Sequence, residues 1–250
     1  MNDYSIKVNN LDHFFIGDDT KRTEALKDIS FAVQPGEFAA ILGPSGCGKS
    51  TLLRILAGMI KPTRGKIEFA DGNPGLQNSE LAMIFQSFAI FPWLNIYENV
   101  EFGLKMKNLP ATERMKKVEE HIKEISLSGF EKTYPKDLSG GMKQRVGIAR
   151  ALAVEPKILF MDEPFSSLDA FTAHELRQDV LKIWLRDKTT ILMVTHLVDE
   201  AVEMADRVLV MTPRPGRIEA IVPIDLPRPR NRRSQEFFNL VDKIMDIVKV

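Results

Sequence analysis

Glycines, a lysine and a serine form the strongest chemical pattern in this sequence. The segment 43–50 reads Gly-Pro-Ser-Gly-Cys-Gly-Lys-Ser and fits the phosphate-binding pattern G-x-x-x-x-G-K-[ST]. Glycines let the backbone curl so that its N–H groups face a phosphate, and the start of the following helix adds a positive dipole end. Lys49 brings charge to the β- and γ-phosphates, and the Ser50 hydroxyl can bind Mg²⁺. The segment therefore predicts a site for a nucleoside triphosphate.

The same segment supplies most of the residues that we expect to contact the nucleotide. They are Gly43, Pro44, Ser45, Gly46, Cys47, Gly48, Lys49, Ser50 and Thr51. Cys47 is the only cysteine of the 250-residue chain, which excludes an intramolecular disulfide and favours a reducing compartment. As a small residue inside the loop, Cys47 is expected to fill space, and its alkylation should block nucleotide binding sterically.

Two acids that follow an apolar run form the second pattern. The run 157–161 is followed by Asp162, Glu163 and a proline. The carboxyl end of a strand is where α/β sheets bind ligands. Asp162 suits the shell of Mg²⁺, and Glu163 could accept a proton from an attacking water. A solvated strand end is the alternative for two acids alone, and the phosphate loop in the same chain disfavours it.

A serine and two glycines stand at the start of a predicted helix. The segment 138–145 reads Leu-Ser-Gly-Gly-Met-Lys-Gln-Arg. Ser139 is a natural N-cap, and Gly140 and Gly141 expose backbone N–H groups, so the segment could bind a second anion. A single phosphate loop does not need such a site. From these residues alone, an ordinary capped helix is an equal alternative.

Alternating strands and helices must hold these residues in place. Apolar runs at 29–33 and 38–42, separated by Gln-Pro-Gly-Glu, predict strands, and a helix is expected from 48 to about 58. The runs 157–161 and 189–195 are continuously apolar, as in strands buried on both faces of a parallel sheet. The sequence therefore predicts an α/β core with helices on both sides.

A helical insertion and a C-terminal extension interrupt or follow this core. Between 86 and 154 the pattern is helical, notably at 112–126 and 142–154, with no convincing strand. The expected division is 1–85 with 154–210 for the ATP-binding α/β core, 86–153 for the helical subdomain and 211–250 for the extension. In the extension, five prolines precede an amphipathic helix at 234–250, which we expect to pack on its own domain.

The predicted apolar face of the last helix carries Phe237, Phe238, Val241, Ile244 and Val248. Four arginines precede this helix, at positions 228, 230, 232 and 233. They favour a solvated linker, and contact with lipid headgroups is the alternative.

Bulk composition limits the classes of protein. Hydrophobic residues at 44% and charged residues at 27% exclude a bulk-disordered or collagen-like chain. The 34 basic and 34 acidic residues balance, so no nucleic-acid partner is expected, and the four histidines are too scattered for a zinc motif. No apolar stretch approaches the roughly 20 residues of a membrane span, and MNDYSIKV lacks a signal-peptide core. These features predict a cytoplasmic protein.

The segment 138–145 resembles the signature motif of ATP-binding cassette (ABC) ATPases. Other motifs of that family follow in the family's order: Gln86 in the Q-loop, 166–169 as the D-loop, and Thr195 with His196 as the switch. The resemblance implies a P-loop NTPase (RecA-like) α/β core, an N-terminal antiparallel β-subdomain and an inserted helical signature subdomain. It also implies an ATPase that uses ATP and Mg²⁺.

The resemblance assigns chemical roles. Glu163 would polarise the hydrolytic water, and His196 would hold the γ-phosphate and orient Glu163. Gln86 would touch Mg²⁺ or the water, while Ser50 and Asp162 would hold Mg²⁺.

The resemblance also implies pairing. Two cassettes would associate head to tail, with each nucleotide between the phosphate loop of one and 139–141 of the other, and Asp169 would contact the opposing subunit. With one set of motifs here, the pair is a homodimer or a heterodimer with a paralogous ATPase. Adenine would stack on an upstream aromatic residue, and alignment with the family favours Phe15 over Phe14.

At subfamily level the chain resembles ATPase subunits of bacterial importers for nitrate, sulfonate, taurine and related compounds. The segments 91–94, 161–170 and 214–218 (Arg-Pro-Gly-Arg-Ile) carry this likeness. It implies transmembrane permease subunits and a solute-binding protein as partners, and a peripheral place on the cytoplasmic face of the inner membrane. The apolar segment 87–94 would receive a coupling helix of the permease; core of the helical subdomain is the alternative.

Two other functions are considered. A soluble ABC-type ATPase clamp for DNA repair would carry a long coiled coil, and a ribosome-associated clamp usually has two cassettes; the sequence shows neither feature. A P-loop kinase would transfer phosphate to a small molecule and would leave 139–141 without a role. An importer ATPase is therefore the main hypothesis.

Overall fold

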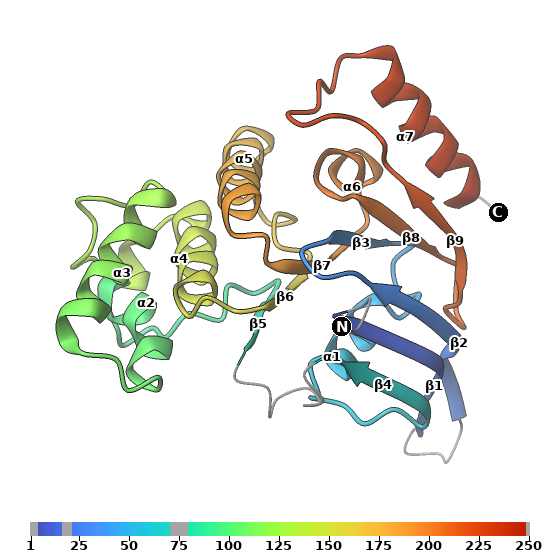
Figure 1. Cartoon of the computed structure of the whole chain (residues 1–250), viewed down its shortest axis with the longest axis horizontal. Helices are drawn as coiled ribbons and strands as arrows, with labels where there is room; N and C mark the ends of the chain where they lie inside the picture. Colours follow the sequence, from blue (N-terminus) through green and yellow to red (C-terminus); the bar gives the residue numbers. More distant parts are fainter. Residues whose placement is uncertain (1–4, 17–21, 71–79, 249–250) are drawn as a thin grey trace.

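The computed structural model describes residues 5–16, 22–70 and 80–248 (Figure 1). Two sheets lie next to each other, and a group of helices extends from one side of them (Figure 1). None of the helices in these residues is both long and apolar enough to cross a membrane.

The smaller sheet is antiparallel, with strand order β2-β1-β4. Its strands are β1 (Ile6–Ile16), β2 (Arg22–Val33) and β4 (Arg64–Phe69). Ile6, Val8 and Leu11 of β1 are buried. This sheet confirms the expected N-terminal antiparallel β-subdomain.

The larger sheet has the order β5-β6-β7-β3-β8-β9. Its strands are β3 (Phe38–Leu42), β5 (Leu81–Ile84), β6 (Ile158–Asp162), β7 (Thr190–Thr195), β8 (Arg207–Met211) and β9 (Ile218–Pro223). All neighbours pair in parallel except β9, which is antiparallel to β8. The carboxyl ends of five strands therefore share one edge, and ligands of α/β proteins bind at such an edge.

Helices cover both faces of the larger sheet. They are α1 (Lys49–Leu56), α5 (Ala170–Asp187) and α6 (Val198–Met204). Alternate residues of β3 serve two cores: Ala40 and Leu42 belong to the cluster that includes α5 and α6, and Ala39 and Ile41 to the cluster with α1 and β1. Burial on both faces explains why the sequence of β3 is apolar without alternation.

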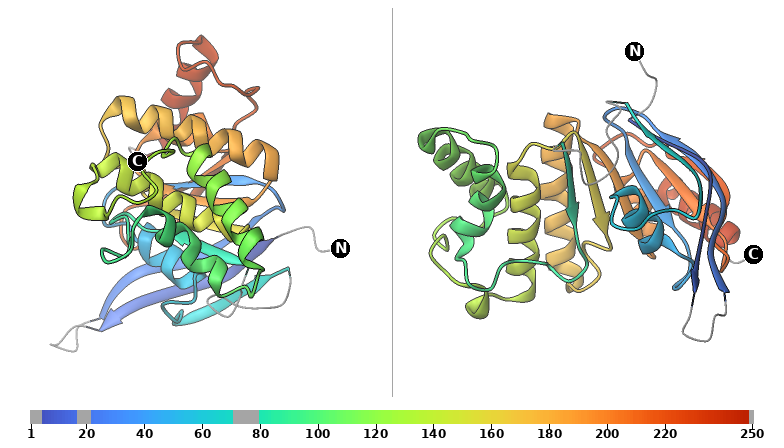
Figure 2. Two further views of the ribbon diagram at one scale, coloured as in Figure 1. Left: turned by 90° about the vertical axis from the view of Figure 1, so that its left-hand side faces the viewer. Right: turned by 90° about the horizontal axis from the view of Figure 1, so that it is seen from below.

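Residues 86–153 contain helices and no strand. The helices are α2 (Ile96–Lys105), α3 (Ala111–Glu124), the short 3₁₀ helix η2 (Pro135–Asp137) and α4 (Gly140–Ala153). In Figure 1 and in the right view of Figure 2, α2 and α3 lie beyond α4, away from the smaller sheet. The segment therefore projects from the α/β core.

The C-terminal helix α7 (Gln235–Val248) packs on its own chain, against α6, β8 and β9. Phe237 and Ile244 are buried there as expected. The expectation for Phe238 is wrong, because its side chain is 49% exposed. The last two residues of the predicted helix lie outside the described residues.

The expectation of a solvated arginine linker is wrong for three of the four arginines. Arg230 donates to the carbonyl oxygens of Val202, Glu203 and Ala205 at the end of α6. Arg228 donates to the Met204 carbonyl and pairs with Asp206, and Arg232 pairs with Asp199. The bonds of Arg228 and Arg230 satisfy carbonyl groups that a helix leaves free at its C-terminus. Together with the ion pairs they attach the extension to α6.

Candidate functional site

The phosphate loop joins β3 to α1, as the sequence predicts. Gly46 and Gly48 have φ angles of 76° and 106°, a region that side chains rarely adopt. A Cβ at Gly48 would also lie 2.8 Å from Leu26 Cδ2 on β2. The loop therefore needs glycine at this position both for its turn and for its contact with the smaller sheet.

Two side chains of the loop are buried within it. Lys49 Nζ donates to the carbonyl oxygens of Gly43 (2.7 Å) and Pro44 (3.0 Å). Cys47 is 1% exposed and fills space under the loop, and burial raises the pKa of its thiol. The ammonium group of Lys49 is thus held at the mouth of the loop, where a phosphate would meet it.

Ser50 and Asp162 form a pair of oxygen donors. Ser50 Oγ donates to Asp162 Oδ1 over 2.8 Å. Burial raises the pKa of the Asp162 carboxyl, and the Ser50 hydrogen bond and the positive charges of Arg54 and Lys49 oppose this shift. A hydroxyl and a carboxylate are hard oxygen ligands suited to Mg²⁺, which usually takes one or two carboxylates plus phosphate oxygens. The pair therefore fits this ion.

Glu163, Gln86 and His196 converge on one point. Gln86 Nε2 donates to Glu163 Oε2 over 3.3 Å, and His196 Nδ1 lies 3.2 Å from the same oxygen. Glu163 has a φ of 45°, an uncommon left-handed conformation at the end of β6. Its carbonyl accepts the backbone N–H and the hydroxyl of Ser166, which fixes this turn.

A hollow of about 350 Å³ gathers eight of the eighteen predicted site residues. It is lined by Ser45, Gly46, Gly48, Lys49, Ser50, Thr51, Gln86, Glu163 and Arg214. Arg214 is the one member to which the sequence analysis gave no role. A larger cavity of about 580 Å³ includes Lys157 and Thr190, at the amino ends of β6 and β7, and contains no predicted site residue. We therefore take the smaller hollow as the candidate site.

Ten predicted residues do not line this hollow. Five of them adjoin it: Gly43, Pro44 and Cys47 belong to the loop itself, Asp162 contacts Ser50, and His196 contacts Glu163. The other five are Phe15, Ser139, Gly140, Gly141 and Asp169. Ser139 caps α4 by accepting the N–H of Met142. Asp169 caps α5 by accepting the N–H groups of Phe171 and Thr172, and these bonds lower the pKa of its carboxyl. An acid directly before a helical pattern could have signalled this cap in the sequence.

The two candidate aromatic residues on β1 differ in exposure. Phe15 is 45% exposed and meets His13 edge to face, with ring centroids 4.7 Å apart. Phe14 is half-buried, with the guanidinium of Arg22 4.8 Å from its ring centre. Phe15 therefore offers the more accessible surface of the two.

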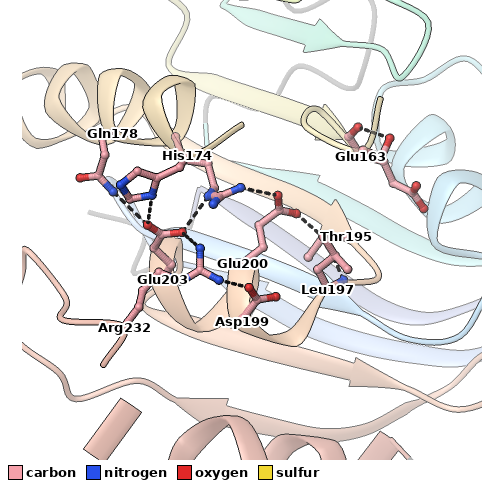
Figure 3. Close-up of polar contacts among 11 residues, drawn as sticks. Glu163, His174, Gln178, Thr195, Leu197, Asp199, Glu200, Glu203 and Arg232 are labelled. Carbon is pink, nitrogen blue, oxygen red and sulfur yellow. Dashed lines mark hydrogen bonds and ion pairs between the residues drawn. The ribbon is translucent and has the colours of Figure 1, made fainter. Parts of the chain in front are cut away.

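A buried polar network holds the turn that carries His196 (Figure 3). The Thr195 hydroxyl donates to Glu200, and its oxygen accepts the N–H of Leu197 over 3.1 Å. Arg177 of α5 lies between Glu200 (3.7 Å) and Glu203 (2.7 Å). His196 is therefore flanked by Thr195, which Glu200 of α6 holds, and by Leu197, which Thr195 holds in turn.

Residues 26–166 match a known family, which is described as "ABC transporter". The chain belongs to the ABC transporter family. It is 48% identical over 248 residues to an uncharacterized ABC transporter ATP-binding protein of Methanocaldococcus jannaschii, covering 98% of this chain and 91% of that protein. It is 44% identical over 244 residues to the aliphatic sulfonates import ATP-binding protein SsuB of Bacillus licheniformis, covering 96% and 92%.

Solved ABC cassettes have the same fold. One is a dimeric ATP-binding cassette in a post-hydrolysis state bound to ADP and Pi, with a TM-score of 0.78, 32% identity, and coverage of 89% of this chain and all of that one. Another is CbiO1 of Clostridium perfringens, part of the ABC transporter complex CbiONQ, with the same score and identity and coverage of 89% and 90%. The expected fold class and ATPase activity are confirmed, and the chain is an ATP-binding ABC subunit.

Proposed function

We propose that this ABC ATPase hydrolyses ATP in the hollow at the phosphate loop and so drives import of a small solute through separate membrane subunits. The observation that carries this proposal is the contact of both Gln86 and His196 with one oxygen of Glu163, beside the loop. A carboxylate held in this way can accept a proton from water at the γ-phosphate. Glu163 is therefore the general base, with His196 and Gln86 as its positioning partners.

In this proposal Ser50, Asp162 and Gln86 hold Mg²⁺ with the nucleotide. When bound, Mg²⁺ supplies positive charge that neutralises the phosphates. The loop residues 43–51 bind the triphosphate through N–H groups and Lys49. Phe15 stacks on adenine.

We propose that the working unit is a dimer, either of two identical chains or of this chain and a paralogous ATPase. The signature residues Ser139, Gly140 and Gly141 lie outside the hollow of their own chain, so they are free to complete the site of a partner. Asp169 contacts the opposing subunit in this arrangement.

We also propose the domain division that the sequence suggested. The helical subdomain is 86–153, between the core segments 1–85 and 154–210, and 211–250 is the extension. The packing of α2 and α3 beyond α4 supports a separate helical unit.

A surface of the helical subdomain supports the proposal of a membrane partner. Trp93 is 69% exposed beside the half-buried ring of Phe91. Large apolar side chains that gather on a surface often mark a site of protein contact. We propose that a transmembrane permease subunit docks there, on the cytoplasmic face of the inner membrane, and that a solute-binding protein delivers the solute. The solute is a sulfonate, nitrate, taurine or a related compound, as the name of the SsuB relative supports. That name does not favour a soluble clamp.

Reconstitution tests this function. The chain, purified together with membranes of its own cell, should bring down a permease, and the complex in liposomes should couple ATP hydrolysis to solute uptake. Lys49→Ala should abolish both hydrolysis and uptake. Hydrolysis by a complex that moves none of these solutes would contradict the substrate class, and capture of the chain only by nucleic acid or ribosomes would contradict import.

A further inference from the structure

We propose that Arg214 binds the phosphates of the nucleotide and that the turn at 212–217 exists to hold it there. This inference rests on the proposed function and adds a binding residue to its site. Arg214 belongs to the Arg-Pro-Gly-Arg-Ile segment, which the proposed function leaves without a role.

Arg214 reaches the nucleotide site from a distant part of the chain. It lies 168 residues after Gly46, yet it lines the same hollow as Lys49 and Glu163, and its Nε donates to the Gly46 carbonyl over 3.2 Å. The bond to Gly46 holds the guanidinium against the phosphate loop. Its two terminal nitrogens have no hydrogen-bond partner among the described residues. Arginine presents these N–H groups in a flat fork that matches phosphate oxygens.

The backbone around Arg214 is locked to the phosphate loop. Gly216 donates to the Ala25 carbonyl and accepts from the N–H of Lys27, each over 3.0 Å, which ties the turn to β2. A Cβ at Gly216 would lie 2.1 Å from the carbonyl oxygen of Cys47, so the turn touches the loop backbone directly. Thr212 closes the turn, because its hydroxyl oxygen accepts the N–H of Arg217 over 3.0 Å.

This locking matters for binding. An arginine on a mobile hairpin would have to be ordered when the nucleotide binds, and the entropy lost would weaken binding. The turn that carries Arg214 is already ordered in the folded chain, so this cost is smaller. Lys49 donates two of its hydrogen bonds to loop carbonyls. Arg214 therefore adds a second cation whose terminal donors face the same anion.

Arg217 supplies a matched control. It is an exposed arginine of the same turn and does not line the hollow. Arg214→Ala should weaken ATP binding about tenfold, whereas Arg217→Ala should change it less than twofold. Arg214→Lys keeps the positive charge but lacks the forked pair of N–H donors, so its ATP affinity should lie between those of wild type and Arg214→Ala. Melting of the nucleotide-free variants shows whether the turn remains folded.

The phosphate contact is separated from simple support of the loop by comparing ATP, ADP and AMP in competition with a fluorescent ATP analogue. A phosphate contact predicts a loss that grows with the number of phosphates. An equal loss for all three, or a loss below twofold for ATP, would overturn the proposal. Lys49→Ala serves as a reference in the same assay: if it also leaves ATP affinity unchanged, the nucleotide site itself is misplaced and the proposed function fails, not only Arg214.

Discussion

His196 Nδ1 lies 3.2 Å from Glu163 Oε2, and the amide of Gln86 donates to that same oxygen. The three side chains follow the ends of β7, β6 and β5, which are neighbours in the larger sheet. Parallel pairing thus brings residues 77 and 33 positions apart to one carboxylate. The group proposed for hydrolysis is distinct from the Lys49 loop proposed for binding, so the two functions can be tested separately.

Glu163→Gln should retain ATP binding and lose turnover. The amide keeps the shape and can still contact His196, but it cannot take a proton from water. We expect kcat to fall about 10²–10⁴-fold with ATP affinity within a few-fold of wild type, and an ATP-bound dimer to accumulate. Steady-state hydrolysis and size-exclusion chromatography with ATP measure these effects. Near-normal turnover would remove Glu163 from its role as base.

His196→Ala tests the partner of that base. Loss of the imidazole leaves Glu163 Oε2 with Gln86 alone, so the carboxylate is positioned less well. A fall of about 10²-fold in kcat with little change in KM is expected, as for the loss of one preorganised polar group in an active site. His196→Gln, which keeps a donor, should recover part of the rate. Equal rates for wild type and His196→Ala would show that the contact is only structural.

The sequence predicted elements that local patterns define. Continuous apolar runs identified β3, β6 and β7, because strands buried on both faces need no polar alternation. It did not predict how the extension is attached. Arg230 caps α6 across 28 residues of sequence, and a run of arginines looks the same whether it is solvated or bound to carbonyls. Such a contact depends on tertiary packing, which no local pattern records.

The candidate site also contains residues that local motifs predicted and residues that depend on tertiary packing. Ser50 and Asp162 come from compact motifs, and the structure brings them to 2.8 Å. Arg214 was seen only as part of a subfamily pattern, since its place in the hollow depends on the fit of Gly216 against Cys47. The role of Glu200 was missed for a related reason: its partner Arg177 lies on another helix.

Cys47 should react slowly with iodoacetamide. Its thiol is buried and its pKa is raised above the ordinary value, so at pH 7.5 less thiolate is present than in an exposed cysteine. The rate should rise as pH increases through and beyond 9.0, the ordinary value for this group. Mass spectrometry of the adduct follows the reaction, and urea-unfolded chain is the control. Reaction as fast in the folded chain as in the unfolded one would contradict this burial.

Arg230→Met should loosen the C-terminal extension. The half-buried guanidinium lies among carbonyl groups at the end of α6, and desolvation lowers its pKa to about 10. Its loss leaves these carbonyls without a donor, which costs about 1–3 kcal/mol. Limited proteolysis should cut faster between β9 and α7. Arg233→Met is the matched control, because Arg233 is exposed and its side chain has no polar partner among the described residues. Equal cutting of both variants would argue against the cap.

Glu200→Gln should change the pH dependence of stability. Burial raises the pKa of Glu200, and the Thr195 hydrogen bond and the charge of Arg177 oppose this shift. Between the ordinary value of 4.5 and the raised value, the folded chain holds a proton that the unfolded chain has lost, so folding stability falls as pH rises through this window.

Glutamine mimics the protonated acid at every pH and removes this loss. The free energy of unfolding of Glu200→Gln, minus that of wild type, should therefore increase from pH 5 to pH 7.5. Urea unfolding without nucleotide measures this difference. Glu219→Gln, at an exposed position on β9, should show no such trend. A difference that is constant with pH would mean that Glu200 ionises as readily in the folded chain as in the unfolded one. The Glu200 carboxylate beside His196 would then be ionised in the folded chain with no free-energy cost from its desolvation.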